Sequence, residues 1–171
     1  MREFETKNYK IFEMFSNQWA LVTGGTPSHY NTCTIGWGSL GSIWGGPGEK
    51  RAIVTVYVNP DRYTWGFLKD SERFSVAFFP QEYRKAMSYI GTHSGRDGDK
   101  VAEAGLTPKE MDGAVTFEEA ELTFICKKLY QAPFEREGLA DEINNGIYKN
   151  WQPHWMFVGE IVAVEDLRQN G

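Results

Sequence analysis

The sequence has few of the residues from which metal sites and disulfide frameworks are built. Its 171 residues include two cysteines and three histidines. Cys33 and Cys126 lie far apart and form no CxxC pair, which argues against a thiolate zinc site and against a disulfide-stapled secreted scaffold. The histidines are too scattered to suggest a metal centre, so we expect no metal. We expect a reducing, cytoplasmic location.

An excess of positive charge and a long apolar run are also lacking. Lysine and arginine total 18 against 23 acidic residues, for a net charge of -5. A general nucleic-acid binder needs a basic face, and a polybasic membrane patch needs the same, so we expect neither partner. Residues 1–10 are polar and charged, and they show no signal peptide. Hydrophobic residues still make up 41% of the chain, which suffices for one folded domain over residues 1–171.

Charged residues are absent from Met14 to Gly48. The segment is no transmembrane helix, because glycine and small polar residues interrupt every apolar run. Its many glycines would let a ligand approach the backbone closely. The alternative is a buried β-meander whose turns require glycine. The residues alone leave both interpretations open.

Short apolar runs bounded by turn residues predict a mainly β fold. The run 52–58 is apolar on both faces, which is typical of a central strand, whereas the alternation over 120–126 indicates a half-exposed strand. Asn59 and Pro60 are typical of a helix start. Many short strands and few helices favour a single β-barrel with helices packed outside. Strands are expected at 19–23, 32–36, 52–58, 73–79, 120–126 and 155–164, helices at 59–69, 81–90 and 99–104, and an irregular excursion at 132–153.

Three motifs carry candidate chemistry, and each has a plain structural alternative. Residues 36–41 match GxGxxG, but the glycine- and proline-rich residues that follow cannot form the helix of a dinucleotide-binding motif. The segment 59–64 offers helix amides, Arg62 and two hydroxyls, which suit either a phosphate site or an ordinary capped helix. The loop 93–100 could close over an anion or simply cap a helix.

Two single residues have the same ambiguity. Cys33 is either a nucleophile or, as is more common in an apolar strand, a small buried hydrophobe. His154 precedes a strongly apolar strand, where a lone histidine is more often a hydrogen-bonded filler than a catalyst.

Taken together and in order, five segments resemble the flavin reductase-like family, in particular its flavoredoxin-like branch. The segments are 31–38, 56–64, 91–100, 118–122 and 154–161. The resemblance extends from about Trp19 to Val164. It implies a six-stranded antiparallel split barrel, a homodimer, and FMN held at the subunit interface.

The resemblance also implies which positions surround FMN. The stretch 31–34 would line the isoalloxazine edge, and Trp37 would form a wall of the ring or ribityl site. Residues 57–64 would lie near the ribityl phosphate, and the loop before Lys100 would add polar contacts. The implied cofactor-binding residues are Asn31, Thr32, Cys33, Thr34, Trp37, Tyr57, Arg62, Tyr63, Thr64, Ser94 and Lys100.

His154 matches the family histidine that faces the flavin where nicotinamide docks. We therefore expect an FMN-binding flavoprotein that transfers hydride from the nicotinamide of NADH or NADPH to flavin, with His154 orienting the nicotinamide. Cys33 and Trp155 depart from the residues usual in this branch, which affects the shape of the nicotinamide slot. The alternatives are a non-enzymatic electron carrier that serves a redox partner protein, and a domain that has lost its cofactor.

Overall fold

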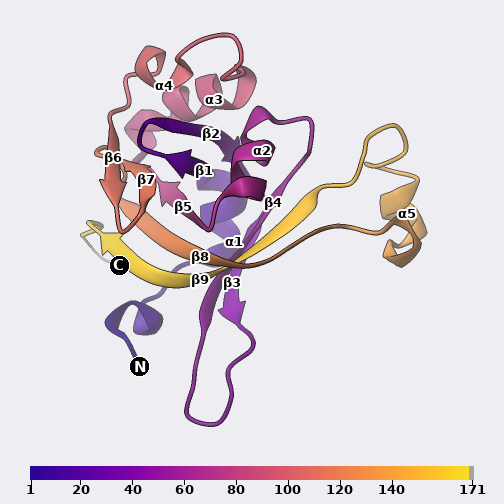
Figure 1. Ribbon diagram of the computed structural model, residues 1–171, viewed down its shortest axis with the longest axis horizontal. Coiled ribbons are helices and arrows are strands. Elements are labelled where there is room, and N and C mark those ends of the chain that lie inside the picture. Colours follow the sequence, from indigo (N-terminus) through magenta and orange to yellow (C-terminus); the bar gives the residue numbers. More distant parts are fainter. Residues whose placement is uncertain (170–171) are drawn as a thin grey trace.

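The computed structural model describes residues 1–169; the last two positions of the expected domain, 170 and 171, lie outside the described residues. Within residues 1–169, seven strands form one antiparallel sheet in the order β2-β1-β5-β8-β9-β4-β3 (Figure 1). The sheet curls so that β2 and β4 contact each other without pairing. The strands are β1 Ala20–Thr26, β2 His29–Ile35, β3 Gly38–Ser42, β4 Ala52–Val58, β5 Arg73–Phe78, β8 Leu122–Pro133 and β9 Trp155–Asp166.

Short helices flank this sheet, and a β-hairpin covers part of its outer side (Figure 1). The hairpin consists of β6 Pro108–Met111 and β7 Ala114–Phe117. The helices are α1 Ile11–Glu13, α2 Tyr63–Asp70, α3 Arg84–Thr92, α4 Lys100–Glu103 and α5 Asp141–Asn144, with 3-10 turns at Glu3–Thr6, Gln81–Tyr83 and Arg136–Gly138 and a π turn at Met14–Gln18. In the part of the chain that is described, no helix combines the length and apolar composition that crossing a bilayer requires.

Neighbouring strand residues enter two different apolar cores. Val22 and Val76 lie in the larger core, which fills the barrel, whereas Leu21 and Ala77 lie in a second core with Ile90 of α3. This follows from the alternation of side chains between the two faces of a strand. Burying each such aliphatic side chain contributes about 1.5–3 kcal/mol. The β-barrel with helices packed outside is thereby confirmed.

The expected count of six strands is wrong. The main sheet has seven, because Gly38–Ser42 pairs residue by residue with β4 as strand β3. Glycine and serine have low strand propensity, which concealed this edge strand in the sequence. The same strand contains the end of the GxGxxG match, so the exclusion of a dinucleotide-binding helix there is confirmed.

Two further expectations need correction. Helix α2 begins at Tyr63 rather than at Asn59, because the Asn59 side chain accepts a hydrogen bond from the Asp61 amide (3.2 Å) and forms a turn. The strand after residue 120 is buried rather than half-exposed over residues 122–126. Its polar Thr123 bonds Thr116 of the covering hairpin, Oγ1 to Oγ1 at 3.1 Å.

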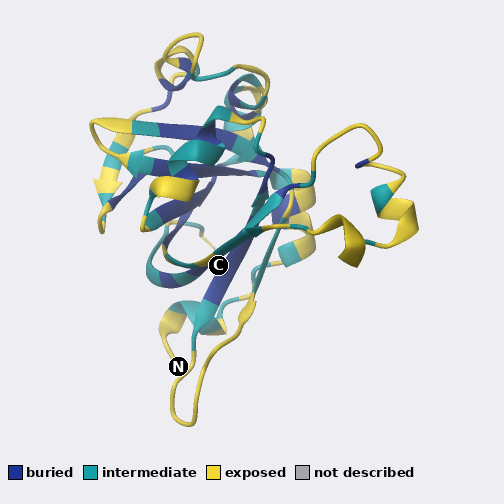
Figure 2. Ribbon diagram, turned by 45° about the vertical axis from the view of Figure 1, so that its right-hand side comes forward, coloured by how far each residue is buried: buried dark blue, intermediate teal, exposed yellow. Residues whose placement is uncertain are grey.

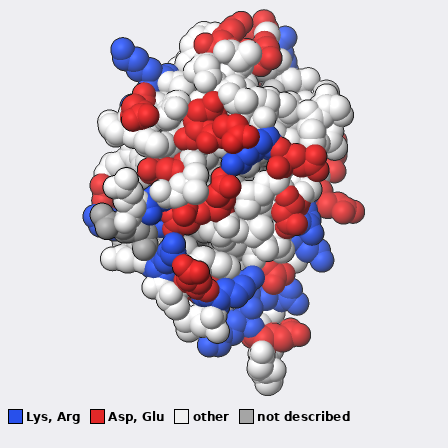
Figure 3. Space-filling view, turned by 90° about the vertical axis from the view of Figure 1, so that its left-hand side faces the viewer, with Lys and Arg blue, Asp and Glu red and all other residues white. Residues whose placement is uncertain are grey.

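Two segments project from the barrel. One is the loop between β3 and β4, and the other is the excursion between β8 and β9 that carries α5; both are largely exposed (Figure 2). The second agrees with the expected excursion. On the face shown in Figure 3, acidic side chains predominate in the upper part, and basic side chains gather in the lower part with some acidic ones among them.

Candidate functional site

Several of the predicted residues meet at the open seam of the barrel, where β2 faces β4. A cavity of about 160 Å³ lies there, which we call the seam cavity. The predicted residues that line it are Cys33, Thr34, Trp37, Tyr57, Arg62 and His154. Asn59, which the sequence singled out only as a helix start, and Trp151, which it did not single out, line it as well. The seam is therefore the candidate site.

His154 is a buried side chain of the seam cavity with a hydrogen-bonded ring nitrogen. It is 8% exposed, and its Nδ1 lies 2.8 Å from the Tyr148 hydroxyl. That hydroxyl oxygen also accepts a bond from the His154 backbone amide at 3.4 Å. When the Tyr148 hydroxyl donates to Nδ1, the imidazole proton resides on Nε2. Burial lowers the pKa of His154 to about 4, so the ring is neutral at pH 7.

Aromatic rings enclose this histidine. The Trp37 ring lies 4.5 Å from the imidazole at 36°, and Trp151 approaches it edge-on at 4.8 Å. Neither tryptophan brings a charge. The surroundings therefore favour a neutral hydrogen-bond donor over an acid or base that changes charge.

The excursion between β8 and β9 is attached at the seam cavity. Trp151 Nε1 donates to Asp61 Oδ2 (2.8 Å), and Asn59 Nδ2 donates to the Gln152 carbonyl oxygen (2.7 Å). These bonds join the end of the excursion to the turn between β4 and α2. The sequence signal for Tyr148 and Trp151 was two aromatic residues in the six positions before His154, which are otherwise not apolar.

A second, apolar hollow of about 430 Å³ adjoins the seam cavity. Trp37 and Tyr57 line both, so they stand between the two spaces. Tyr57 stacks on Phe134 with centroids 5.5 Å apart and an interplanar angle of 19°. Trp37 is 43% exposed. The arrangement offers open aromatic faces against which a flat ring can pack.

Arg62 supplies the positive charge of the site. One of its guanidinium nitrogens donates to the Gly91 carbonyl oxygen at 2.8 Å. Its neighbour Thr64 is buried and donates to Asn31 Oδ1 at 2.7 Å. Thr64 and Asn31 thus hold α2 against β2, and their bonded oxygens are directed at each other.

The structure places other predicted residues away from the seam cavity. Lys100 is 6% exposed, and its ammonium donates to the carbonyl oxygens of Ile90 (3.1 Å) and His93 (2.9 Å). Burial lowers the pKa of Lys100. Thr32 Oγ1 is enclosed between Thr23 Oγ1 (2.8 Å) and the Val22 carbonyl oxygen (3.0 Å). Lys100 and Thr32 line a separate cavity of about 320 Å³.

Ser94 and Tyr63 also lie outside the seam cavity. Ser94 Oγ accepts a bond from the Arg96 amide at 3.2 Å, so it shapes the loop before α4. Tyr63 lines a larger groove together with Arg62.

Cys33 lines the seam cavity but is unsuited to nucleophilic attack. It is almost fully buried, and burial raises the pKa of its thiol. A buried thiol with a raised pKa is inert, which agrees with the small-hydrophobe interpretation. Within residues 1–169, no group of three or more histidine, cysteine or acidic side chains is arranged to hold a metal ion.

Comparison with known protein families identifies the family to which the sequence is similar. The model of the flavin reductase like domain family matches residues 12–170. None of the curated proteins compared with the chain matches it.

Solved structures share the fold at low sequence identity. Flavoredoxin from Methanosarcina acetivorans superposes with a TM-score of 0.67 at 22% identity, over 89% of this chain and 69% of that one. An FMN-binding protein from Thermus thermophilus with bound 1-cyclohex-2-enone superposes with a TM-score of 0.67 at 22% identity. The match covers 98% of this chain and 81% of that one. A Streptomyces globisporus NADH:FAD oxidoreductase in complex with NAD and FAD fragments superposes with a TM-score of 0.60 at 17% identity. The match covers 87% of this chain and 74% of that one.

Proposed function

The chain belongs to the flavin reductase like domain family, and on this premise we propose that it binds FMN and transfers hydride from NADH or NADPH to flavin. The observation that carries the proposal is the seam cavity, where open aromatic faces surround a neutral, oriented histidine. Flavin sites combine a flat apolar slot with a few polar groups at defined positions.

The residues at the seam fit the chemical character of FMN. Trp37 and Tyr57 offer aromatic walls for the ring, and the edge of β2 offers backbone groups near Cys33 and Thr34. Arg62 would neutralise phosphate charge on a protein whose net charge is -5. Bound FMN would supply an electron-accepting ring at this position.

The chain's own residues would bind and orient the second reactant. His154 presents Nε2–H as a neutral donor, which suits a carboxamide oxygen, and Tyr148 keeps the proton on that nitrogen. Trp151 and the attached excursion limit the access of water to the histidine. In this proposal His154 positions nicotinamide and transfers no proton.

We further propose that two copies of the chain complete the site. A cavity of about 160 Å³ is smaller than the roughly 300–1,000 Å³ typical of ligand pockets, so one chain encloses only part of a flavin. Exposed aromatic residues border the seam and the projecting β3–β4 loop, including Trp37 and Trp44. A partner subunit covering these residues would enlarge the enclosed volume.

A spectroscopic titration with a turnover assay tests the proposal. FMN is added to the purified protein, and NADH or NADPH oxidation is then followed with free FMN as acceptor. We expect saturable FMN uptake and steady oxidation of one pyridine nucleotide. Uptake without steady oxidation would instead support an electron carrier that serves a redox partner protein, and absence of saturable uptake would reject the flavin site itself.

A further inference from the structure

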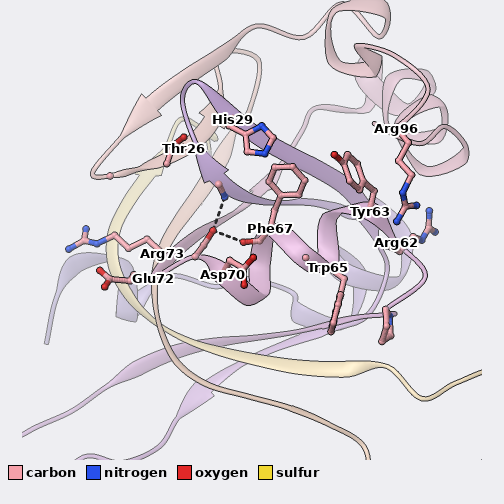
Figure 4. Close-up of a pocket in the computed structure, with 15 residues that line it drawn as sticks. Thr26, His29, Arg62, Tyr63, Trp65, Phe67, Asp70, Glu72, Arg73 and Arg96 are labelled. Atoms are coloured by element: carbon pink, nitrogen blue, oxygen red, sulfur yellow. Dashed lines mark hydrogen bonds between the residues drawn. The ribbon is translucent and has the colours of Figure 1, made fainter.

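A groove with a volume of about 880 Å³ lies beside the seam cavity. Helix α2, the β1–β2 turn and the loop before α4 supply its walls (Figure 4). Arg62 lines both this groove and the seam cavity. A ligand held at Arg62 can therefore extend from one space into the other.

The walls of the groove are fixed by close packing. A Cβ at Gly24 would lie 2.8 Å from the Leu68 amide nitrogen, so glycine there lets α2 lie directly on β1. Ser71 Oγ accepts from the Gly25 amide (2.8 Å) and donates to the Phe67 carbonyl oxygen (2.6 Å), the two bonds drawn in Figure 4. The groove is thus a built feature of the fold.

An aromatic ledge lines the middle of the groove. The rings of His29 and Phe67 lie 4.8 Å apart, and Tyr63 meets Phe67 edge-on at 5.2 Å (Figure 4). All three residues line the groove. Such a ledge suits a flat heteroaromatic ring, which gains stacking energy on it.

Two guanidinium groups lie at the end of the groove that Tyr63 borders. Arg96 lies over the Tyr63 ring, with its Cζ 4.7 Å from the centroid, and Arg62 directly precedes Tyr63 (Figure 4). Among residues 1–169 neither arginine forms an ion pair, although the chain is acidic. By contrast, Arg73 of the same groove is paired with Asp112 at 2.8 Å. Unpaired arginines in a groove suit a phosphate group.

The loop that carries Arg96 is held in place. Gly95 packs so tightly on the Asn31 amide that a Cβ there would overlap it, and the same Cβ would lie 3.2 Å from the Tyr63 ring. The remaining charges of the groove, Asp70 and Glu72, are carboxylates and can accept bonds from sugar hydroxyls. One groove is therefore lined by groups that suit each part of a nucleotide: an aromatic ledge for the base, carboxylates for the sugar, and arginines for the phosphate.

We propose that this groove binds an adenosine 5′-phosphate moiety, the part that FAD and nicotinamide dinucleotides have in common. The base lies on the ledge of His29 and Phe67, and the phosphate contacts Arg62 and Arg96. The proposal rests on the proposed function, because it places the second half of a dinucleotide next to the seam cavity.

Calorimetric titration with AMP tests this without any turnover. We expect AMP to bind saturably, and adenosine and inorganic phosphate to bind at least about tenfold more weakly each, since each carries half of the contacts. Arg96→Ala should weaken AMP binding about tenfold. Arg84→Ala is the matched control, because Arg84 also lies over an aromatic ring, Trp19 at 3.3 Å, outside the groove. An AMP affinity that Arg96→Ala leaves unchanged overturns the proposal.

Further titrations identify the source of the adenylate group. If FAD supplies it, Arg96→Ala weakens FAD binding and spares FMN binding; if the nicotinamide dinucleotide supplies it, the variant raises the KM for that substrate alone. Equal weakening of FMN and FAD assigns Arg96 to the flavin phosphate and overturns the proposal. Because AMP is titrated separately, AMP binding in a protein that takes up no FMN rejects the proposed function and leaves the groove assigned.

Discussion

Tyr148 orients His154 through one hydroxyl, so its removal tests the proposed role of the histidine. We expect Tyr148→Phe to keep the packing of the buried ring and to lose the fixed proton on Nε2. NAD(P)H oxidation should slow about tenfold, equivalent to about 1.4 kcal/mol, while the Kd for FMN changes less than twofold. Steady-state kinetics and FMN titration measure the two quantities.

Tyr89→Phe is the control for this variant. The Tyr89 hydroxyl also makes a side-chain hydrogen bond, to exposed Glu103, but it lies outside the seam cavity. A larger effect of Tyr148→Phe on FMN binding than on turnover would make Tyr148 a purely structural residue.

The lowered pKa of His154 makes stability depend on pH. The folded pKa is about 4 against an ordinary 6.5, because burial disfavours the charged ring more than nearby Asp61 favours it, and Arg62 disfavours it further. Between these values the unfolded chain binds more protons, so stability falls as the pH drops from about 6.5 to 4. The contribution amounts to at most about 3 kcal/mol.

Urea denaturation at pH 7 and pH 5 checks this dependence. His154→Gln should reduce the difference in unfolding free energy between the two pH values, because glutamine does not titrate. His93→Gln, at an exposed histidine, should retain the wild-type difference. Identical pH dependence in all three proteins would contradict a buried, neutral His154.

The sequence predicts best those helices and strands whose conformation follows from the propensity of their own residues. The β-branched run 52–58 is strand β4 with the expected bounds, because its apolar side chains suit a central strand on both faces. Strand β3 was not predicted, since its glycines and serines pair only because β4 is beside them. Thr123 is likewise buried by a contact with the β6–β7 hairpin, which directly precedes β8 but was not predicted.

The same limit applies to the candidate site. Trp37, Tyr57 and His154 line one cavity, and their contact with a flavin stays a prediction. Lys100 and Thr32 do not reach the seam cavity, because backbone carbonyls and a threonine bind their polar atoms. Residue type indicates that a group can bind a ligand, but only the folded chain shows whether an internal partner already occupies it.

The contact between α2 and β1 leaves no room for a methyl group at Gly24. In Gly24→Ala the new Cβ would meet the backbone of α2 at 2.8 Å, so the helix must move. We expect a loss of about 1–3 kcal/mol in unfolding free energy. Gly41→Ala is the matched control on strand β3, where a Cβ meets nothing within 4 Å. Equal stability of the two variants in urea would show that α2 is not seated on β1.

At the scale of the whole molecule, the two projections expose apolar side chains that differ in how well they suit a protein interface. Ile43 and Trp44 follow β3 on one projection, and Trp44 lies 6.4 Å from exposed Tyr130 of β8, centroid to centroid. Ile143 is exposed on α5 of the other projection. Clustered exposed aromatic residues such as Trp44 and Tyr130 are typical of protein interfaces, whereas single exposed apolar residues are ordinary.

A charged substitution on each projection tests which of the two projections takes part in a protein interface. If two copies complete the flavin site, Trp44→Glu should weaken self-association at least about tenfold and reduce FMN affinity with it, because a carboxylate buried in the interface lacks a partner. Ile143→Glu should leave both unchanged. Analytical ultracentrifugation over a dilution series, with FMN titration at each concentration, measures the linkage between association and binding. A wild-type chain that stays monomeric at every concentration and still takes up FMN stoichiometrically would show that one copy holds the flavin alone.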